Sequence, residues 1–140
     1  MKKLCCLIII LLLTGCGNKL VCTNRDDTTD YTIDETVIFK FDDSEIKNGK
    51  YILKLHIDKS YKDYLSKFKN SLILEYTNLY DIGVKRKVSI KDNNLNFVLK
   101  YDSSKFNKEE KEQLIKHGLY EYGNYGIVKN ELEKDGYECN

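Results

Sequence analysis

The sequence predicts an α+β domain, an antiparallel sheet with helices packed on one face. Two observations carry this prediction: several segments alternate apolar and polar residues at period two, and others space their apolar residues as helices do. The predicted order along the chain is three strands, one helix, two strands and two helices (β-β-β-α-β-β-α-α). No repeat, low-complexity segment or second domain interrupts it.

Three strands are expected in the first half of the domain. Residues 20–23 form a short first strand, and the polar residues 24–30 form a turn region. Residues 31–41 and 46–58 each alternate in polarity, which is typical of half-buried strands.

The connection between the second and third strands has two candidate turns. Residues 42–45 have turn chemistry, and Asn48-Gly49 is a hairpin signal. We favour the earlier turn, because the later one would leave the Val37–Phe41 face without its partner. Asn48-Gly49 is then expected to form a bulge.

The strongest predicted helix spans residues 60–79, with Ser60 as its N-cap and Asp63 completing an approximate capping box. A hairpin of residues 84–91 and 95–101 follows.

Two shorter helices are expected near the C-terminus. Asn107 and Glu110 cap the first, which ends at Gly118, and the second spans residues 124–134. The predicted core draws on the apolar faces of the main elements and comprises Phe39, Leu53, Leu55, Leu65, Phe68, Leu72, Phe97 and Leu99.

The N-terminus resembles a bacterial lipoprotein signal. Lys2 and Lys3 precede an apolar stretch too short to cross the roughly 30 Å of a bilayer core, and Leu13–Cys16 (Leu-Thr-Gly-Cys) matches the lipobox. The resemblance implies cleavage of residues 1–15 and a diacylglyceryl group on the Cys16 thiol. The alternative is an ordinary secretory signal with an incidental cysteine.

This signal implies a location and a domain plan. Residues 16–19 would be the lipidated N-terminus and a short tether, and residues 20–140 a single domain. Two or more acyl chains anchor stably, so we expect the protein on the outer face of the bacterial cytoplasmic membrane.

The charge balance gives no support to nucleic-acid binding. Once Lys2 and Lys3 leave with the signal, 21 basic residues remain against 22 acidic ones, a net charge of −1.

Cys22 and Cys139 remain as the only thiols of the mature chain besides Cys16. A single intramolecular disulfide is therefore expected between them, and two free thiols are the alternative. A metal site is poorly supported, because neither cysteine has a second Cys or a His at ligand spacing.

Candidate catalytic chemistry is sparse. Alternation places His56 and Asp58 on one strand face with Ser60 nearby, but this is the polar face, where a solvated histidine is the simpler interpretation. No glycine-rich phosphate loop, paired CxxC or calcium loop is present, so no cofactor and no enzyme activity are expected. His117 suits the last turn of its helix as a cation.

Charge is the one pattern that suggests binding. The predicted C-terminal helices are rich in Glu, whereas the outward face of the sheet is rich in lysine. Such a face could meet anionic headgroups or wall polymers, and the alternative is a solvated face in a lysine-rich chain. The lysines concerned are Lys40, Lys54, Lys85, Lys87, Lys91 and Lys100.

The lipobox, Phe41–Lys47 (Phe-Asp-Asp-Ser-Glu-Ile-Lys) and Glu131–Cys139 (Glu-Leu-Glu-Lys-Asp-Gly-Tyr-Glu-Cys) together resemble the small YehR-like lipoproteins of low-GC Gram-positive bacteria. That resemblance implies an α+β fold and carries over no catalytic residue.

These observations favour a lipid-anchored, non-catalytic envelope protein that binds the membrane through its lipid and meets an envelope protein or wall polymer. Two alternatives are a ligand-capturing accessory of a transporter or sensor, which is usually far longer, and a small envelope hydrolase using His56 and Asp58.

Overall fold

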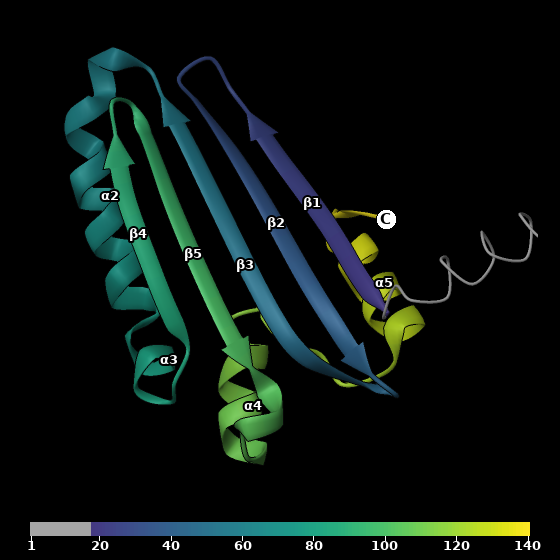
Figure 1. The fold of residues 1–140 in the computed structure, drawn as a ribbon. Helices are drawn as coiled ribbons and strands as arrows, with labels where there is room; N and C mark the ends of the chain where they lie inside the picture. Colours follow the sequence, from purple (N-terminus) through teal and green to yellow (C-terminus); the bar gives the residue numbers. More distant parts are fainter. Residues whose placement is uncertain (1–17) are drawn as a thin grey trace, which may run out of the picture.

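Six strands form one antiparallel sheet in the computed structural model, which describes residues 18–140. Their order across the sheet is β4-β5-β3-β2-β1-β6, as Figure 1 shows for the five long strands. The strands are β1 (Lys19–Asp27), β2 (Tyr31–Asp42), β3 (Glu45–Ile57), β4 (Lys85–Lys91), β5 (Asn94–Asp102) and β6 (Glu138–Cys139).

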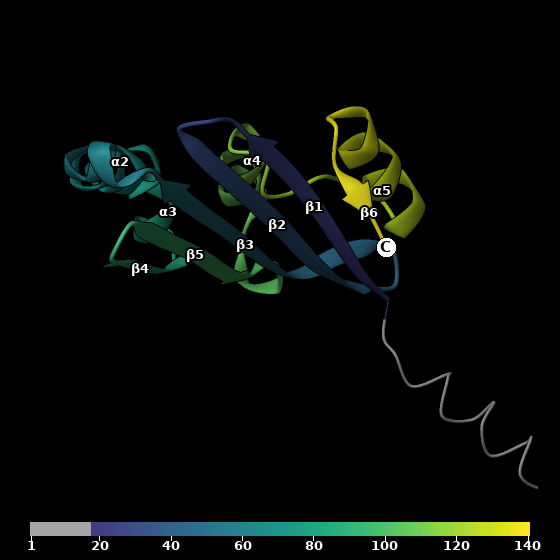
Figure 2. The ribbon, with the colours of Figure 1, turned by 90° about the horizontal axis from the view of Figure 1, so that it is seen from above.

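The helices all lie on one side of this sheet (Figure 2), so the predicted α+β class with helices on one face is confirmed. They are α2 (Lys62–Glu75), α3 (Thr77–Asp81), α4 (Lys108–Lys116) and α5 (Tyr125–Lys134), with short 3₁₀ turns at Lys59–Tyr61 and Ser103–Lys105. We call the covered side of the sheet, which carries Val37, Phe39, Leu53 and Phe97, the helix face. The other side is the open face.

Strand β1 is longer than its sequence indicates. The residues expected to form a turn, 24–27, instead continue the ladder with β2 as far as the pair Asp27↔Thr32. Their low strand propensity is overridden by cross-strand bonds: Arg25 donates to Asp34 at 3.3 Å, and the Thr32 hydroxyl donates to Asp27 at 2.7 Å.

The turn between β2 and β3 falls within residues 42–45, as predicted, and Asp43 adopts a positive φ of 53° there. The bulge lies one residue earlier than expected: Lys40 pairs with Asn48 and Phe41 with Ile46, which leaves Lys47 unpaired. Gly49 serves a different purpose, because a Cβ at this position would overlap the buried ring of Tyr101.

The first long helix starts later and breaks earlier than predicted. Ser60 is not its N-cap; Asp58 caps a 3₁₀ turn by accepting from the Ser60 amide at 2.9 Å, and α2 begins two residues further on. Helix α2 ends before Tyr76, beyond which the Thr77 hydroxyl donates back to the Ile73 carbonyl at 2.8 Å. Such back-bonding bends helices, and α3 follows at a new angle.

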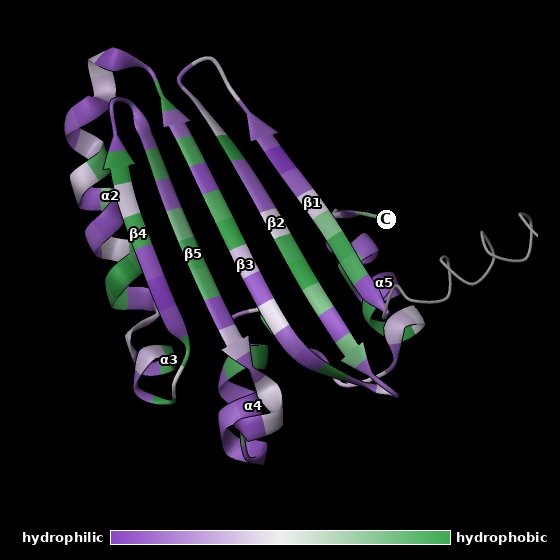
Figure 3. Cartoon of the chain, viewed as in Figure 1, coloured by the Kyte–Doolittle hydropathy of each residue, from purple (hydrophilic) through white to green (hydrophobic). Residues whose placement is uncertain are grey.

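The core lies between the sheet and the helices. Strand colouring in Figure 3 alternates toward the C-terminal end of β3, as period two requires. Seven of the eight predicted core residues are buried, but Phe68 is only half-buried, because it lies at the edge of α2 beside a surface hollow. The predicted cap of α4 is confirmed, because Asn107 and Glu110 form a capping box. Asn124, expected as the first residue of the last helix, is instead the N-cap of α5 and accepts from the Ile127 amide.

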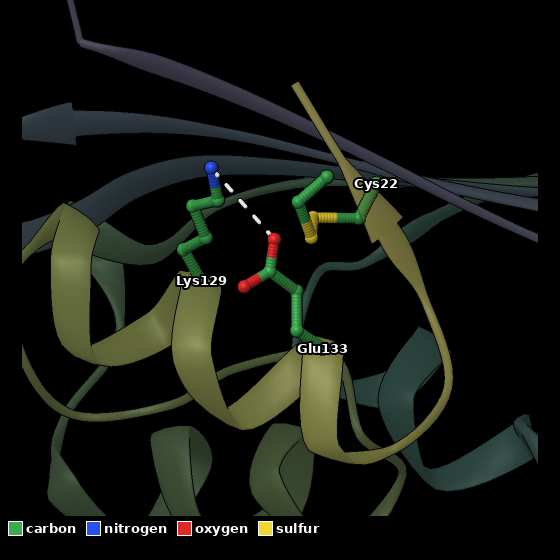
Figure 4. Close-up of a disulfide and its surroundings, with 4 residues drawn as sticks. Cys22, Lys129 and Glu133 are labelled. Atoms are coloured by element: carbon green, nitrogen blue, oxygen red, sulfur yellow. Dashed lines mark ion pairs between the residues drawn. A yellow bond between two sulfur atoms is a disulfide. The ribbon is translucent and has the colours of Figure 1, made fainter.

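The C-terminal strand β6 was not expected. It pairs with β1 so that Cys22 and Cys139 lie directly opposite each other, with Cα atoms 4.1 Å apart, and the structure joins them in a disulfide. Figure 4 shows this bridge beside α5, where Lys129 and Glu133 form an ion pair at 3.7 Å. The bridge ties the two ends of the described chain together.

Candidate functional site

The open face carries a row of three lysines on adjacent strands. Lys85 of β4 pairs with Lys100 of β5, and Lys100 pairs with Lys50 of β3. Residues directly opposite in a sheet have Cβ atoms about 4.5–5.5 Å apart, and like charges there repel. We call Lys50, Lys85 and Lys100 the basic row.

No carboxylate neutralises this row. Within residues 18–140, none of its ammonium groups lies within 4.0 Å of a carboxylate oxygen. In bulk water two unit charges at 4 Å repel by about 1 kcal/mol, so an anion that bridges the row would relieve repulsion as well as gain attraction.

The remaining predicted lysines differ in their surroundings. Lys87 lies on the same face of β4 one row along, and Lys40 lies diagonal to Lys50 on β2. Lys54 pairs with Asp34 and therefore faces a carboxylate across the sheet, whereas Lys91 is at the far end of β4. The sheet thus assembles part of the predicted set and leaves Lys54 and Lys91 apart from it.

Lys50 is the member that the sequence analysis missed. It lies on β3 four residues before Lys54, and the same alternation places both side chains on the open face. Period two alone could have identified it; its pairing with Lys100 could not have been found without the strand order.

A hollow of about 380 Å³ adjoins the basic row. Lys85, Lys100 and Lys105 line it together with Asn48, and the half-buried ring of Phe106 forms part of its apolar wall. It therefore combines three ammonium groups with an amide and an apolar surface.

One carboxylate, Asp102, also lines this hollow. A hydrogen bond from the Ser104 hydroxyl lowers the pKa of Asp102, so the group is ionised, and Lys105 lies 3.9 Å from it. Lys85 and Lys100 remain available to an external anion.

The His56 group does not form a nucleophile and base arrangement. His56 is exposed on the open face with Nδ1 2.8 Å from Asn94 Oδ1, while the Ser60 hydroxyl donates to Asp58 rather than to the imidazole. That hydrogen bond is the main cause of the lowered pKa of Asp58. The expectation that the protein is not an enzyme stays a prediction.

Residues 18–140 contain no helix that is long and apolar enough to cross a membrane. They also contain no cluster of three or more His, Cys, Asp or Glu that could hold a metal ion. The lipobox and Cys16 lie outside the described residues.

Fold and site define an α+β domain with one helix-covered sheet face and one open, basic face. No family model and no curated protein matches the chain. Its fold is similar to the NMR structure of a protein from Streptococcus pneumoniae TIGR4, with a TM-score of 0.51 and 13% identity over 87% of this chain and 84% of that one. Identity at this level shows the fold alone, and the YehR-like resemblance stays a prediction.

Proposed function

We propose that this protein is a lipid-anchored, non-catalytic envelope protein that binds an anionic surface through the open face of its sheet. The basic row carries this proposal. By alternation, the open face of β3, β5 and β4 carries six lysines and two carboxylates. Both carboxylates are at strand ends: Asp102, and Glu45, which is paired with Lys111.

The position of the row fits attachment through Cys16. Lys50 pairs with Ile38 and Ile38 with Val21, so the row continues across the sheet to a residue five positions after Cys16. Five extended residues span at most about 17 Å. A lipid on Cys16 would therefore hold this end of the open face near the headgroups.

Phosphate is the chemical group that this face would recognise. Lysine acts toward phosphate as a point charge, and each lysine close to an anionic membrane contributes about 1 kcal/mol. The same chemistry occurs in phosphatidylglycerol headgroups and in glycerol phosphate polymers of the wall, so both are tested.

The test uses the chain from Gly17 onward, without lipid, so that the acyl chains do not dominate binding. Neutralising Lys85 and Lys100 together to Gln should weaken binding to vesicles of phosphatidylglycerol and phosphatidylcholine about 30-fold at low salt. The loss should shrink at high salt, because the Debye length falls to about 3 Å at 1 M. Lys62→Gln with Lys67→Gln on α2 removes the same charge from the helix side and should have little effect.

A second arm replaces the vesicles with soluble poly(glycerol phosphate). Binding to the polymer alone would identify the wall as the target, and binding to vesicles alone would identify the membrane. Equal losses in the Lys85/Lys100 and Lys62/Lys67 variants would contradict a specific role for the basic row.

Anchoring is tested separately on whole cells. Cys16→Ser should release the protein from membranes or leave it unprocessed. A variant that is processed normally and stays membrane-bound would disprove lipid attachment at this residue.

A further inference from the structure

A carboxylate interrupts the apolar helix face of β2. Ile33 and Val37 are apolar, but Glu35 lies between them on the same side of the strand and is half-buried. Its two oxygens accept hydrogen bonds from tyrosine hydroxyls: Oε1 from Tyr51, and Oε2 from Tyr137 at 3.3 Å.

The charge of Glu35 has no internal partner. Within residues 18–140, no Lys, Arg or His nitrogen lies within 4.0 Å of its oxygens. Burial, reinforced by the carboxylate, raises the pKa of Tyr51 and of Tyr137, so both hydroxyls stay protonated and donate. The two neutral hydroxyls stabilise the Glu35 carboxylate by hydrogen bonding, but they do not neutralise its charge. A bound cation would do so.

An apolar hollow lies on the same strand face as Glu35, and Ile33 is the lining residue nearest to Glu35 along β2. It has a volume of about 340 Å³ and lies between α2 and the strands β2 and β3; its lining includes Ile33, Leu55, Phe68 and the exposed rims of Tyr31 and Tyr64. Ile33 is two residues from Glu35 on one strand face, a spacing of about 7 Å. Small-molecule sites are mostly apolar, with volumes of about 300–1,000 Å³ and a few placed polar groups.

The surroundings of the hollow favour a cation over an anion. Its lining contains no charged side chain, and the Tyr31 hydroxyl donates to a second carboxylate, Asp26, at 3.1 Å. Lys67 is not part of the lining, but its ammonium lies 5.4 Å from the ring centroid of Tyr64, so the face of this ring already accommodates a cation.

We propose that Glu35 and this hollow bind a small organic cation, a protonated amine carried on an apolar or aromatic group. The ammonium would donate to the Glu35 carboxylate, and the apolar group would fill the hollow between Ile33, Leu55 and Phe68. This site is on the opposite face of the sheet from the basic row, and it stands or falls independently of the function proposed above.

The alternative is that the hydrogen bonds of Glu35 only connect β2, β3 and the residue before β6. A glutamine keeps one acceptor oxygen for one tyrosine and turns its NH2 group to the other, whose hydroxyl can accept as well as donate. Glu35→Gln would therefore keep both connections while removing the charge. The two interpretations therefore predict different behaviour of one conservative variant.

The test is an amide-proton NMR titration of the chain from Gly17 onward with three probes of matched shape: phenethylammonium, 3-phenylpropionate and 2-phenylethanol. We expect saturable shifts with phenethylammonium, concentrated at Ile33, Glu35, Leu55 and Tyr137, and at least tenfold weaker binding of the anion and the alcohol. Glu35→Gln should weaken phenethylammonium binding at least tenfold. Glu112→Gln, an exposed position on α4, should leave it unchanged.

Several results would overturn the proposal: no saturable shift with phenethylammonium, equal binding of all three probes, or unchanged affinity in Glu35→Gln. The comparison of probes on the unmodified protein requires no variant, so it decides the question even if Glu35→Gln unfolds. A failure here would leave the vesicle results for the basic row untouched, because the two experiments use different faces and opposite charges.

Discussion

Opening the disulfide should destabilise the domain by an amount that its loop length predicts. Cys22 and Cys139 are 117 residues apart, and the chain-entropy relation gives about 4.9 kcal/mol for closing a loop of this length at 25 °C. Domains of this size are stable by roughly 5–15 kcal/mol, so the bridge would account for a large share.

Few other contacts hold the C-terminal strand. Asn140 donates its amide to Val21 at 2.9 Å and accepts from the Val21 amide at 3.3 Å, and β6 itself has only two residues. We therefore expect a loss of about 3–5 kcal/mol in the free energy of unfolding, with the lower figures reflecting residual structure in the reduced denatured chain.

Reduced wild-type protein, Cys139→Ala and Cys22→Ala together distinguish the effect of losing the disulfide from the effect of losing side-chain packing. Cys139→Ala removes the bridge at a half-buried position and should match the reduced wild-type protein, whereas Cys22→Ala also removes a buried sulfur and should be slightly worse. The measurement is equilibrium urea unfolding, in which the slope should also rise because the uncrosslinked denatured chain exposes more surface.

A difference of less than about 1 kcal/mol between the oxidised and reduced protein would contradict this prediction, provided that mass spectrometry confirms the bridge in the oxidised sample.

Three further predictions concern stability. Gly49→Ala should lower the free energy of unfolding by about 1–3 kcal/mol, because its Cβ would overlap the Tyr101 ring. Gly126→Ala in α5 meets only ordinary contacts and should raise it by about 0.5–1 kcal/mol. Changes of the same sign in chemical denaturation of the two variants would contradict this. Phe97→Ala should cost about 3–5 kcal/mol, and the half-buried Phe68→Ala clearly less; equal costs would mean that Phe68 is fully packed. Burial raises the pKa of Tyr76 to about 12, above its unfolded value of 10. The contribution of this residue to the free energy of unfolding is therefore complete below pH 10 and is lost as the pH rises toward 12. Urea midpoints measured between pH 9 and 12 in wild type and Tyr76→Phe should diverge in that window, and parallel curves would exclude this source.

The five long strands and the cap of α4 could be predicted because their signals are local. Alternation places Leu53 and Leu55 on the buried side of their strand, whichever strands pair with it. The capping box of Asn107 and Glu110 requires only the first turn of its own helix. The extension of β1 depends on cross-strand bonds to β2. The break at Tyr76 depends on packing against Phe97, whose ring centroid is 5.3 Å from that of Tyr76. Neither set of partners lies in a local stretch of the sequence.

The candidate site was predictable in composition and not in geometry. Lysine alternation pointed to the open face, but adjacency of Lys50, Lys85 and Lys100 requires the order β4-β5-β3, which joins segments far apart in the sequence. Glu35 left a clearer signal: it is the one charged residue on the otherwise apolar side of β2 between Tyr31 and Phe39. A polar residue in such a position needs partners, and those partners are remote in the sequence: Tyr51 lies on β3, 16 residues away, and Tyr137 precedes β6, 102 residues away.

The basic row and the Glu35 site lie on opposite faces of the sheet, so one orientation at the membrane suits both. If the open face meets an anionic surface near the lipid, the helix face, with Glu35 and its hollow, points away from that surface. A cationic ligand beside the membrane would otherwise be drawn to the headgroups themselves, whose potential acts within about a Debye length of roughly 8 Å at physiological salt. The sheet itself separates the hollow from the open face by about 10 Å, since side chains extend roughly 5 Å to each side of a sheet. A carboxylate held at that height competes with the membrane for organic cations where the headgroup field is already weak, which a site on the open face could not do.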